Sequence, residues 1–530
     1  THCISSAASD VYKRQIMSKL KPGFKIFLIA IAVFVIGFGV KTFWLDKVPA
    51  DKVSGSKSSK GLSSLFGSKG DEITLGVNTY AGFMPFMYLN NGLKANEDCI
   101  LYKEYGLKLN IVIQDDFEAG RAAFKNNDID IIYCTADALP VEMSESGDMS
   151  DARLFNISNW SRGADAIVVN KNIRTVADLK GKKVACSEGT ASHTLLINTL
   201  ETNGIKPNEI TLIKVGSGLD AAQAFKANQV DAAVVFAPDD ADIVASISGS
   251  KVLVSTKQAT NIICDCLIAK QSYLDENKET VTKLVSALLY ANVEMNTNND
   301  AVSQAAKAFA KAFGTDEAFA IDGSKNIRYA TLEDEANFFG LNSSYTGVKG
   351  DELYSKMART YEGLGLCKRP LSWRKVSDES IIEGLLTNKE SVKGDQSAEA
   401  KKTFTAPTKE VQTKTEISNK KLTINFPVNG DLLDSDARSL IDREFVGIAK
   451  EFNGARIRVV GECDATGNIA YNLELSKRRA QAVVDYLVKE YGFDTNRFMV
   501  FGEGSKRAIA DGVKGSNDAY RVTNFMLVSD

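Results

Sequence analysis

The chain has 530 residues, of which 44% are hydrophobic and 25% charged, and both fractions are ordinary for globular protein. Its length predicts about two to four domains. The formal net charge of −3 argues neither for nucleic acid nor for an acidic polymer as a general partner, and we expect no nucleic acid. The sequence contains no Walker loop, zinc-type cysteine pair or catalytic-triad spacing. We therefore predict no enzymatic activity, no metal and no cofactor.

The N-terminal segment predicts a membrane anchor. Residues 1–16 resemble translated sequencing-adapter sequence, so we exclude them as an artefact and take Met17 as the start. In residues 17–45 a basic flank precedes a span of about twenty apolar residues, which predicts one transmembrane helix with a cytoplasmic N-terminus. The alternative is a signal peptide cleaved near residues 48–50. The span holds no Asp or Glu, which argues against a proton-driven stator subunit. Residues 46–71 are rich in Ser, Gly and Lys and predict a linker.

Residues 72–387 predict a solute-binding domain with two α/β lobes. Apolar strand-like runs alternate with amphipathic helical segments in two similar series, a pattern typical of parallel sheets with crossover helices. We expect the segment after Val252 to return to the first lobe. Ligands of such folds bind at the carboxyl ends of strands, between the lobes. The predicted strands are 73–77, 107–113, 129–134, 166–169, 184–185, 210–215, 232–236 and 262–268, and the predicted helices are 117–125, 190–200, 219–227, 281–293 and 302–313.

Acidic and hydroxyl side chains follow two strands of the first lobe. Asp115 and Asp116 end one strand, where they would select an amine; alternatively, Asp116 caps the helix that begins at Phe117. Thr135 and Asp137 end the next strand, and the same two interpretations apply. All four are candidate solute-binding residues.

Further candidates follow other strands of this domain. Tyr80 and Phe83 come after the first strand and would either wall a pocket or pack in the core. The segment Ser187–Thr190, with Ser187, Gly189 and Thr190 as candidates, opens a helix and predicts either an anion site or a plain N-cap. His193 lies in the first turn of that helix, and we interpret it as structural or as a ligand contact.

The region 72–385 resembles the type II periplasmic substrate-binding proteins of the nitrate/sulfonate/taurine and thiamine-precursor group of ABC transporters. The resemblance implies a clamshell that closes on a small solute, with an ABC permease as a possible partner. It does not name the solute. The motifs that support it are Gly76–Gly82, Asp115–Phe124, Asp128–Asp130, Val176–Val184 and Asp231–Pro238.

The polar, Lys-rich segment 388–420 predicts a second linker, and residues 421–530 predict an α+β domain. We expect one sheet with helices on one face, in the order βαβαββ. The predicted strands are 422–426, 456–460, 497–501 and 522–528; the predicted helices are 435–452 and the one that carries residues 475–487.

Arg479 stands out in this last domain. Leu475, Arg479, Val483 and Leu487 lie four residues apart, so they share one row of a helix that should be buried. A guanidinium group on such a row needs an anion. Asp464, in the turn before the helix, is the nearest candidate. The two residues would form either an internal ion pair or a pocket for a zwitterion.

Residues 421–530 also resemble the OmpA-like peptidoglycan-binding domain, on the motifs Gly461–Gly467, Asn472–Ala480 and Arg497–Gly504. The resemblance implies that Asp464 and Arg479 hold the diaminopimelate of the peptidoglycan stem. Thr466, Asn472 and Arg521 are further candidates for the same site. The sequence departs from the family in having Glu462-Cys463 and Ala519-Tyr520-Arg521 where His-Thr and Asn-Arg-Arg are usual.

Together these features predict a non-catalytic protein of the Gram-negative envelope. We expect it to be anchored in the inner membrane, with the bulk of the chain in the periplasm, and to bind a small solute and peptidoglycan. The alternative is a structural scaffold whose clamshell docks a protein partner. A third interpretation, from the thiamine-precursor branch, is an enzyme that uses His193.

Overall fold

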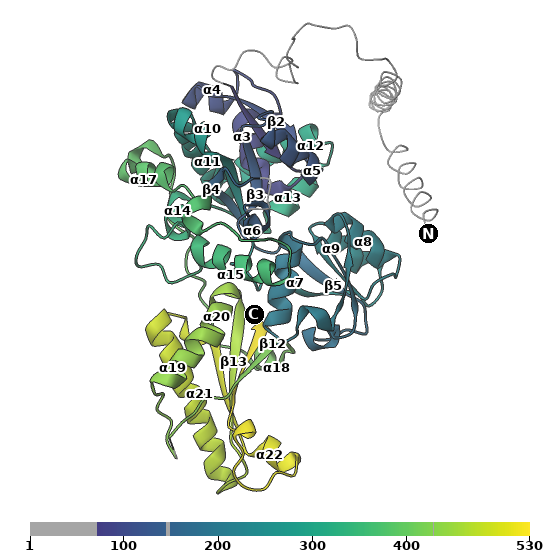
Figure 1. The fold of residues 1–530 in the computed structure, drawn as a ribbon, viewed down its shortest axis with the longest axis vertical. Coiled ribbons are helices and arrows are strands. Elements are labelled where there is room, and N and C mark those ends of the chain that lie inside the picture. Colours follow the sequence, from purple (N-terminus) through teal and green to yellow (C-terminus); the bar gives the residue numbers. More distant parts are fainter. Residues whose placement is uncertain (1–71, 145–148, 428) are drawn as a thin grey trace, which may run out of the picture. The chain divides into compact units, whose positions relative to one another are not determined.

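The computed structural model describes residues 72–144, 149–427 and 429–530 (Figure 1). The predicted membrane span and the first linker lie outside these ranges. Within them, no helix is both long and apolar enough to cross a bilayer. The described residues form three β-sheets.

The first sheet has the strand order β11-β4-β10-β3-β1-β2. β1 is parallel to β2 and β3, whereas β10 is antiparallel to β3 and β4. The prediction of parallel sheets therefore holds only in part, because β10, which enters from the second lobe, and β11 run in the opposite direction to the other four strands. The strands are β1 (Glu72–Val77), β2 (Lys108–Ile113), β3 (Ile131–Thr135), β4 (Ala152–Ser161), β10 (Cys264–Lys270) and β11 (Ile327–Tyr329).

Helices surround this first sheet, and α5 has the bounds that the sequence predicts (Figure 1). Asp116 caps it by accepting a hydrogen bond from the Ala119 N–H, at 3.0 Å. The helices of four or more residues in this lobe are α3 (Met84–Asn90), α4 (Ile100–Tyr105), α5 (Phe117–Lys125), α6 (Leu139–Glu142), α10 (Gln271–Glu276), α11 (Lys278–Thr297), α12 (Asn299–Phe313), α13 (Glu317–Ser324), α14 (Leu332–Phe338), α15 (Gly350–Gly363), α16 (Trp373–Val376) and α17 (Ser380–Thr387).

The second sheet has the order β7-β6-β8-β5-β9, in which β6 is parallel to β7 and β8 while β5 is antiparallel to β8 and β9. Its strands are β5 (Asp165–Val169), β6 (Lys183–Cys186), β7 (Thr211–Lys214), β8 (Ala232–Phe236) and β9 (Lys251–Ser255), and its helices are α7 (Ala191–Glu201), α8 (Gly218–Lys226) and α9 (Asp239–Ser246).

The chain crosses between these two sheets twice, from β4 to β5 and from β9 to β10. Hydrogen bonds join the two crossings: the Ser161 and Thr256 hydroxyls lie 2.7 Å apart, and the Gly163 N–H donates to the Thr256 hydroxyl at 2.8 Å. β10 lies in the first sheet, which confirms the predicted return to the first lobe. Two α/β lobes joined by two crossings form the clamshell of a periplasmic binding protein.

The third sheet forms the C-terminal domain, with the order β12-β15-β13-β14. The strand predicted at 422–426 lies earlier, at 416–422, inside the segment predicted as a linker. This edge strand is polar, and only three of its seven side chains are buried. The elements are β12 (Glu416–Leu422), α19 (Ser435–Ile441), a π-helical turn (Asp442–Val446), α20 (Gly447–Glu451), β13 (Ala455–Glu462), α21 (Ile469–Tyr491), β14 (Phe498–Gly504), α22 (Lys506–Ala510) and β15 (Thr523–Ser529).

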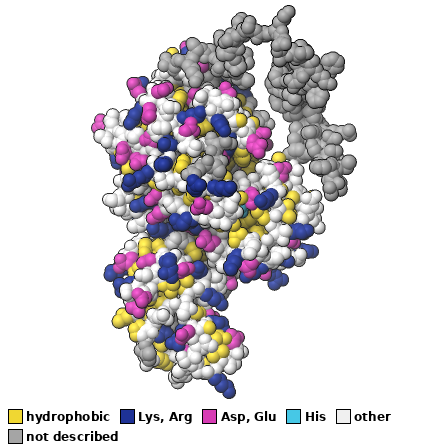
Figure 2. All heavy atoms as spheres, in the orientation of Figure 1, with side chains coloured by type: hydrophobic (Ala, Val, Ile, Leu, Met, Phe, Trp, Pro, Cys, Tyr) yellow, Lys and Arg dark blue, Asp and Glu magenta, His cyan; other side chains and the backbone are white. Residues whose placement is uncertain are grey.

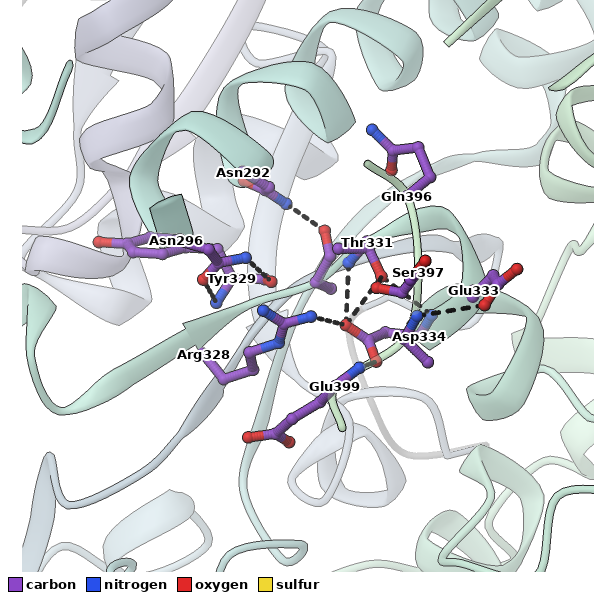
Figure 3. A network of polar contacts seen from close by, with 12 residues as sticks. Asn292, Asn296, Arg328, Tyr329, Thr331, Glu333, Asp334, Gln396, Ser397 and Glu399 are labelled. Carbon is purple, nitrogen blue, oxygen red and sulfur yellow. Dashed lines mark hydrogen bonds and ion pairs between the residues drawn. The ribbon is translucent and has the colours of Figure 1, made fainter. Parts of the chain in front are cut away.

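Residues 396–399, in the first half of that predicted linker, are held against α14 (Figure 3). The Leu332 N–H donates to Gln396 Oε1 at 2.9 Å, and the Thr331 hydroxyl donates to the Ser397 carbonyl at 3.0 Å. The Glu399 N–H donates to an oxygen of Asp334 at 2.8 Å. Because backbone and side chains both take part, this part of the segment is folded onto the clamshell.

Candidate binding sites

The turn that contains Asp464 lies between β13 and α21, and the close packing of α21 on the third sheet holds it in position. A Cβ atom at Gly461 would lie 2.1 Å from the Ser476 carbonyl oxygen, and one at Gly502 would lie 2.5 Å from the Leu473 carbonyl oxygen. Only glycine leaves room for such an approach. The turn between β13 and α21 is therefore held next to the helix that carries Arg479.

Asp464 is buried and anionic. Its two carboxylate oxygens accept hydrogen bonds from the N–H groups of Thr466 (3.0 Å) and Asn517 (3.2 Å). Burial by itself would raise the pKa of Asp464, but these hydrogen bonds and the nearby Arg521 lower it below its usual value. The Arg521 Nε lies 3.1 Å from Asp464 Oδ2.

Arg479 binds backbone carbonyls instead of a carboxylate. Its Nε donates to the Gly430 carbonyl at 3.0 Å and its Nη2 to the Pro427 carbonyl at 3.3 Å, while its guanidinium lies 4.9 Å from the centre of the Phe426 ring. Burial lowers the pKa of Arg479, and the charge of Arg521 lowers it further. The ion pair of Asp464 is thus with Arg521, and the alternative of an internal Asp464–Arg479 pair is wrong.

These three charged groups lie together in one corner of the domain, since Arg521 acts electrostatically on both Asp464 and Arg479. Arg521 also pairs with the exposed Asp518, so the corner presents groups of both charges. That arrangement can accept a carboxylate on the arginines and an ammonium on Asp464.

Thr466 and Asn472 act in this arrangement by holding the turn. Asn472 Nδ2 donates to the Thr466 carbonyl at 2.7 Å and to the Ser505 hydroxyl at 2.9 Å. Glu462, which departs from the family pattern, is buried and pairs with Arg507 and Asn524. The sequence analysis did not anticipate these last two partners, because they lie 45 and 62 residues further along the chain.

In the clamshell, the exposed acids Asp115 and Asp116 have structural partners. Asp115 accepts hydrogen bonds from the N–H (2.7 Å) and the hydroxyl (2.8 Å) of Thr79. Asp116 caps α5, as the alternative interpretation predicts. A contact of either residue with solute stays a prediction.

Tyr80 and Phe83 belong to a group of aromatic rings. The Phe83 ring centre lies 6.0 Å from that of Tyr80 and 5.1 Å from that of Tyr133, and the rings of Tyr133 and Phe117 are 6.3 Å apart. Phe83 is fully buried in the core of the first lobe, whereas Tyr80 is half-buried.

The loop before α7 contains the other candidates. Thr190 does not cap the helix, because its hydroxyl donates to the Ser187 carbonyl at 2.8 Å. The Gly189 N–H donates to His193 Nδ1 at 3.2 Å, so this nitrogen is unprotonated. Burial lowers the pKa of His193 to about 4, and the ring is neutral at pH 7. The Ser187 hydroxyl donates to the Gly216 carbonyl at 3.4 Å.

Asp137 is fully buried, and neither of its carboxylate oxygens completes a hydrogen bond of normal geometry. Burial raises its pKa to about 7, against a smaller opposite effect of the nearby Thr194 and Thr135 hydroxyls. Two more buried acids, Asp165 and Asp265, act electrostatically on it or on each other. The sequence analysis missed both, since Asp165 opens a strand of the second lobe and Asp265 lies within a strand of the first.

The fold and these sites define a periplasmic-binding-protein clamshell joined to a domain with a charged corner. Residues 101–301 match the family model described as NMT1/THI5 like, and residues 425–521 match the model of the OmpA family. The chain is therefore a fusion of an NMT1/THI5-like substrate-binding domain with a C-terminal OmpA domain.

Individual relatives match parts of the chain. A putative binding protein of Brucella abortus is 26% identical over 173 residues, which are 32% of this chain and 53% of that protein. The chain thus spans about half the length of this curated relative. A putative aliphatic sulfonates-binding protein of Escherichia coli is 42% identical over 106 residues, or 20% of this chain and 32% of that protein.

Among solved structures, the periplasmic aliphatic sulphonate binding protein SsuA of Escherichia coli is similar, with a TM-score of 0.47 and 20% identity. The similarity covers 59% of this chain and 100% of that protein.

Proposed function

We propose that this protein holds peptidoglycan through its OmpA domain and binds a small solute between the lobes of its clamshell, without catalysing a reaction. In this proposal the predicted N-terminal span anchors it in the inner membrane, and an ABC permease is a possible recipient of the solute. The observation that carries the proposal is the charged corner, where the buried Arg479 contacts backbone carbonyls, the Phe426 ring and Cys463 near the anionic Asp464.

This corner suits a free diaminopimelate end, which offers one ammonium and one carboxylate. The ammonium would bind Asp464, and the carboxylate would bind Arg479 and Arg521 in charge-assisted hydrogen bonds. Thr466 and Asn472 would keep the turn in place, as their hydrogen bonds do in the described structure.

Basic and acidic side chains are mixed over the face shown in Figure 2, in keeping with the net charge of −3. A partner that is recognised by bulk charge, such as nucleic acid, is not part of the proposal.

The test of the wall-binding part is sedimentation with purified diaminopimelate-type peptidoglycan. We expect Asp464→Ala and Arg479→Ala each to lose most of the retained protein, because each removes one half of the recognition of the zwitterion. Arg478→Ala is the matched control: it neighbours Arg479 but is half-exposed and pairs with Asp431 at 3.0 Å. Equal retention of all three variants, with unchanged circular dichroism, would refute the proposed site.

The solute-binding part is tested by thermal-shift measurements over a library of amines, sulfonates, nitrate, phosphate and pyrimidines. A ligand of the folded state raises the melting temperature by mass action. A flat response over the whole library would favour the scaffold, whose clamshell docks a protein. Covalent change of His193, seen by mass spectrometry after incubation with pyridoxal phosphate and iron, would instead reveal the enzyme.

A further inference from the structure

Three aspartates form a buried acidic cluster where the first lobe meets the crossings between the lobes. Asp137 follows β3, Asp165 opens β5 directly after the first crossing, and Asp265 lies in β10 directly after the second. Asp265 stands opposite Thr135 on one side and Asn159 on the other. Each of the three carboxylates is less than one-tenth exposed.

Among the described residues, no basic side chain is a main electrostatic influence on these three carboxyl groups; Arg121, which acts on the neighbouring Tyr133 and Cys134, pairs with Glu142. The groups that act on Asp137, Asp165 and Asp265 are hydroxyls, an amide and other carboxylates, and none is a Lys, an Arg or the His193 ring. Asp165 has one close donor, the Ser161 hydroxyl at 2.7 Å. Taking several carboxylates out of water without a positive partner is costly, so the ligand-free protein keeps them partly protonated.

Hydrogen-bonding groups next to the cluster also lack partners. Both oxygens of Asp137, the Asn159 Oδ1 and the Tyr133 hydroxyl are buried without a hydrogen bond. When Asp137 is ionised, three of these four atoms can only accept hydrogen bonds. Native proteins leave few such groups unsatisfied, so each calls for a physical explanation. The guest that completes this set is one that donates hydrogen bonds.

A metal ion does not fit. Throughout the residues that the structure describes, no three His, Cys, Asp or Glu side chains lie close enough together to hold one, so the three aspartates share a region without converging on a single point. The aromatic rings of Tyr80, Phe83 and Tyr133 belong to the same region, since the charges of Asp265 and Asp165 act on Tyr80 and that of Asp265 acts on Tyr133. Ring faces and carboxylates together favour an organic cation.

We propose that the clamshell selects a solute with a positively charged ammonium, amidinium or guanidinium group, which binds Asp137 with the help of Asp165 and Asp265. This inference rests on the proposed function, because it names the class of solute for the same cleft. An anion without such a group would face three carboxylates, while the Arg121 guanidinium in this region is already paired with Glu142. If the solute also has an anionic end, the uncapped start of α7 is where backbone N–H groups are available for it.

The test measures binding of matched ligands to the full chain by calorimetry and thermal shift. The pair 2-aminoethanesulfonate and ethanesulfonate differs only in the amine, and agmatine and 1,4-diaminobutane are cations without an anionic end. We expect at least one amine to bind and ethanesulfonate not to bind. Equal binding of ethanesulfonate would overturn the inference and leave solute binding intact. No response to any amine, sulfonate or nitrate would count against both.

Variants then locate the contact. For an amine that binds, Asp137→Asn should weaken the affinity at least tenfold, and Asp165→Asn should weaken it as well. Glu279→Gln is the control, an exposed carboxylate on α11 that pairs with Lys283. The melting temperature without ligand shows that each variant folds. Unchanged affinity in both folded aspartate variants would contradict the assignment.

Discussion

Burial separates the clamshell aspartates considered as candidates into two groups. Asp115 and Asp116 are exposed and serve as hydrogen-bond acceptors for nearby backbone N–H groups. Asp137, Asp165 and Asp265 are buried, and both carboxylate oxygens of Asp137 lack a hydrogen-bond donor. The sequence identifies an acidic residue after a strand, but exposure depends on what the other lobe covers. Only Asp137 of the buried group could therefore be proposed from the sequence.

The ionisation of Asp137 should make the free energy of unfolding of the ligand-free protein depend on pH. Its pKa of about 7 in the folded state lies above the ordinary value of 3.8, so the folded state binds the proton more tightly. The stability that this group contributes is fully present below about pH 4 and is lost as the pH rises toward 7. Asp137→Asn cannot titrate. The free energy of unfolding of this variant, relative to that of the unmutated protein, should therefore increase as the pH rises from about 4 to 7, by at most about 1.4 kcal/mol per pH unit.

Urea unfolding at intervals from pH 4.5 to 8 measures this difference. Glu279→Gln serves as the control, since the pKa of this exposed carboxyl is lowered by Lys283 and it titrates below the window. Parallel stability curves for Asp137→Asn and the unmutated protein would show that Asp137 is not held in the buried environment described.

At the scale of the element, periodicity predicts most strands but only a minority of the clamshell helices, and it misses the polar strand β4. β4 holds two buried asparagines, Asn156 and Asn159. The buried Glu335 accepts hydrogen bonds from Asn156 Nδ2 and from the Ile157 N–H, the latter at 3.1 Å. Polar residues in a central strand weaken its apolar signal, and the partner that satisfies Asn156 lies 179 residues away. The polar edge strand β12 was misplaced for a related reason.

The packing of α21 on the third sheet gives a prediction for two glycines. Gly461→Ala should destabilise the OmpA domain by a few kcal/mol, because the new Cβ would meet the Ser476 carbonyl oxygen and force the helix away. Gly447→Ala is the matched control. Its Cβ meets nothing within 4 Å in a helix, so it should be neutral or stabilise by up to about 1 kcal/mol. Thermal unfolding of both variants checks the difference, and equal melting temperatures would contradict the close packing.

At the scale of the whole described chain, a buried ion pair joins the clamshell to the OmpA domain. Lys356 Nζ, on α15, lies 2.8 Å from Glu451 Oε1, at the end of α20, and 3.3 Å from Glu201 on α7. Beside it, the Asn261 N–H donates to the Glu451 carbonyl at 3.1 Å, and the Gly454 N–H donates to the Gln258 carbonyl at 3.1 Å. The clamshell and the OmpA domain therefore contact each other directly, although the segment between them was predicted as a flexible linker.

Removing one partner of this pair should be costly. Lys356→Met leaves Glu451 buried without its cation, and we expect a loss of about 3–5 kcal/mol in the free energy of unfolding. The double variant Lys356→Met/Glu451→Met should recover most of that loss, since it leaves no unpaired charge. Denaturant unfolding of the two single variants and the double variant gives the coupling energy. A coupling energy near zero would mean that this pair does not join the two domains.

The sequence by itself determined the two α/β lobes, the C-terminal OmpA-like domain and the candidates Asp464 and Arg479, because periodicity and motif spacing are local properties of the chain. Tertiary structure decided the antiparallel strands at the crossings, the pairing of Asp464 with Arg521, and the gathering of Asp137, Asp165 and Asp265. Each of these depends on contacts between residues far apart in sequence. Burial is a property of the folded molecule, and it decides whether a carboxylate caps a helix, as Asp116 does, or is left without a donor, as Asp137 is.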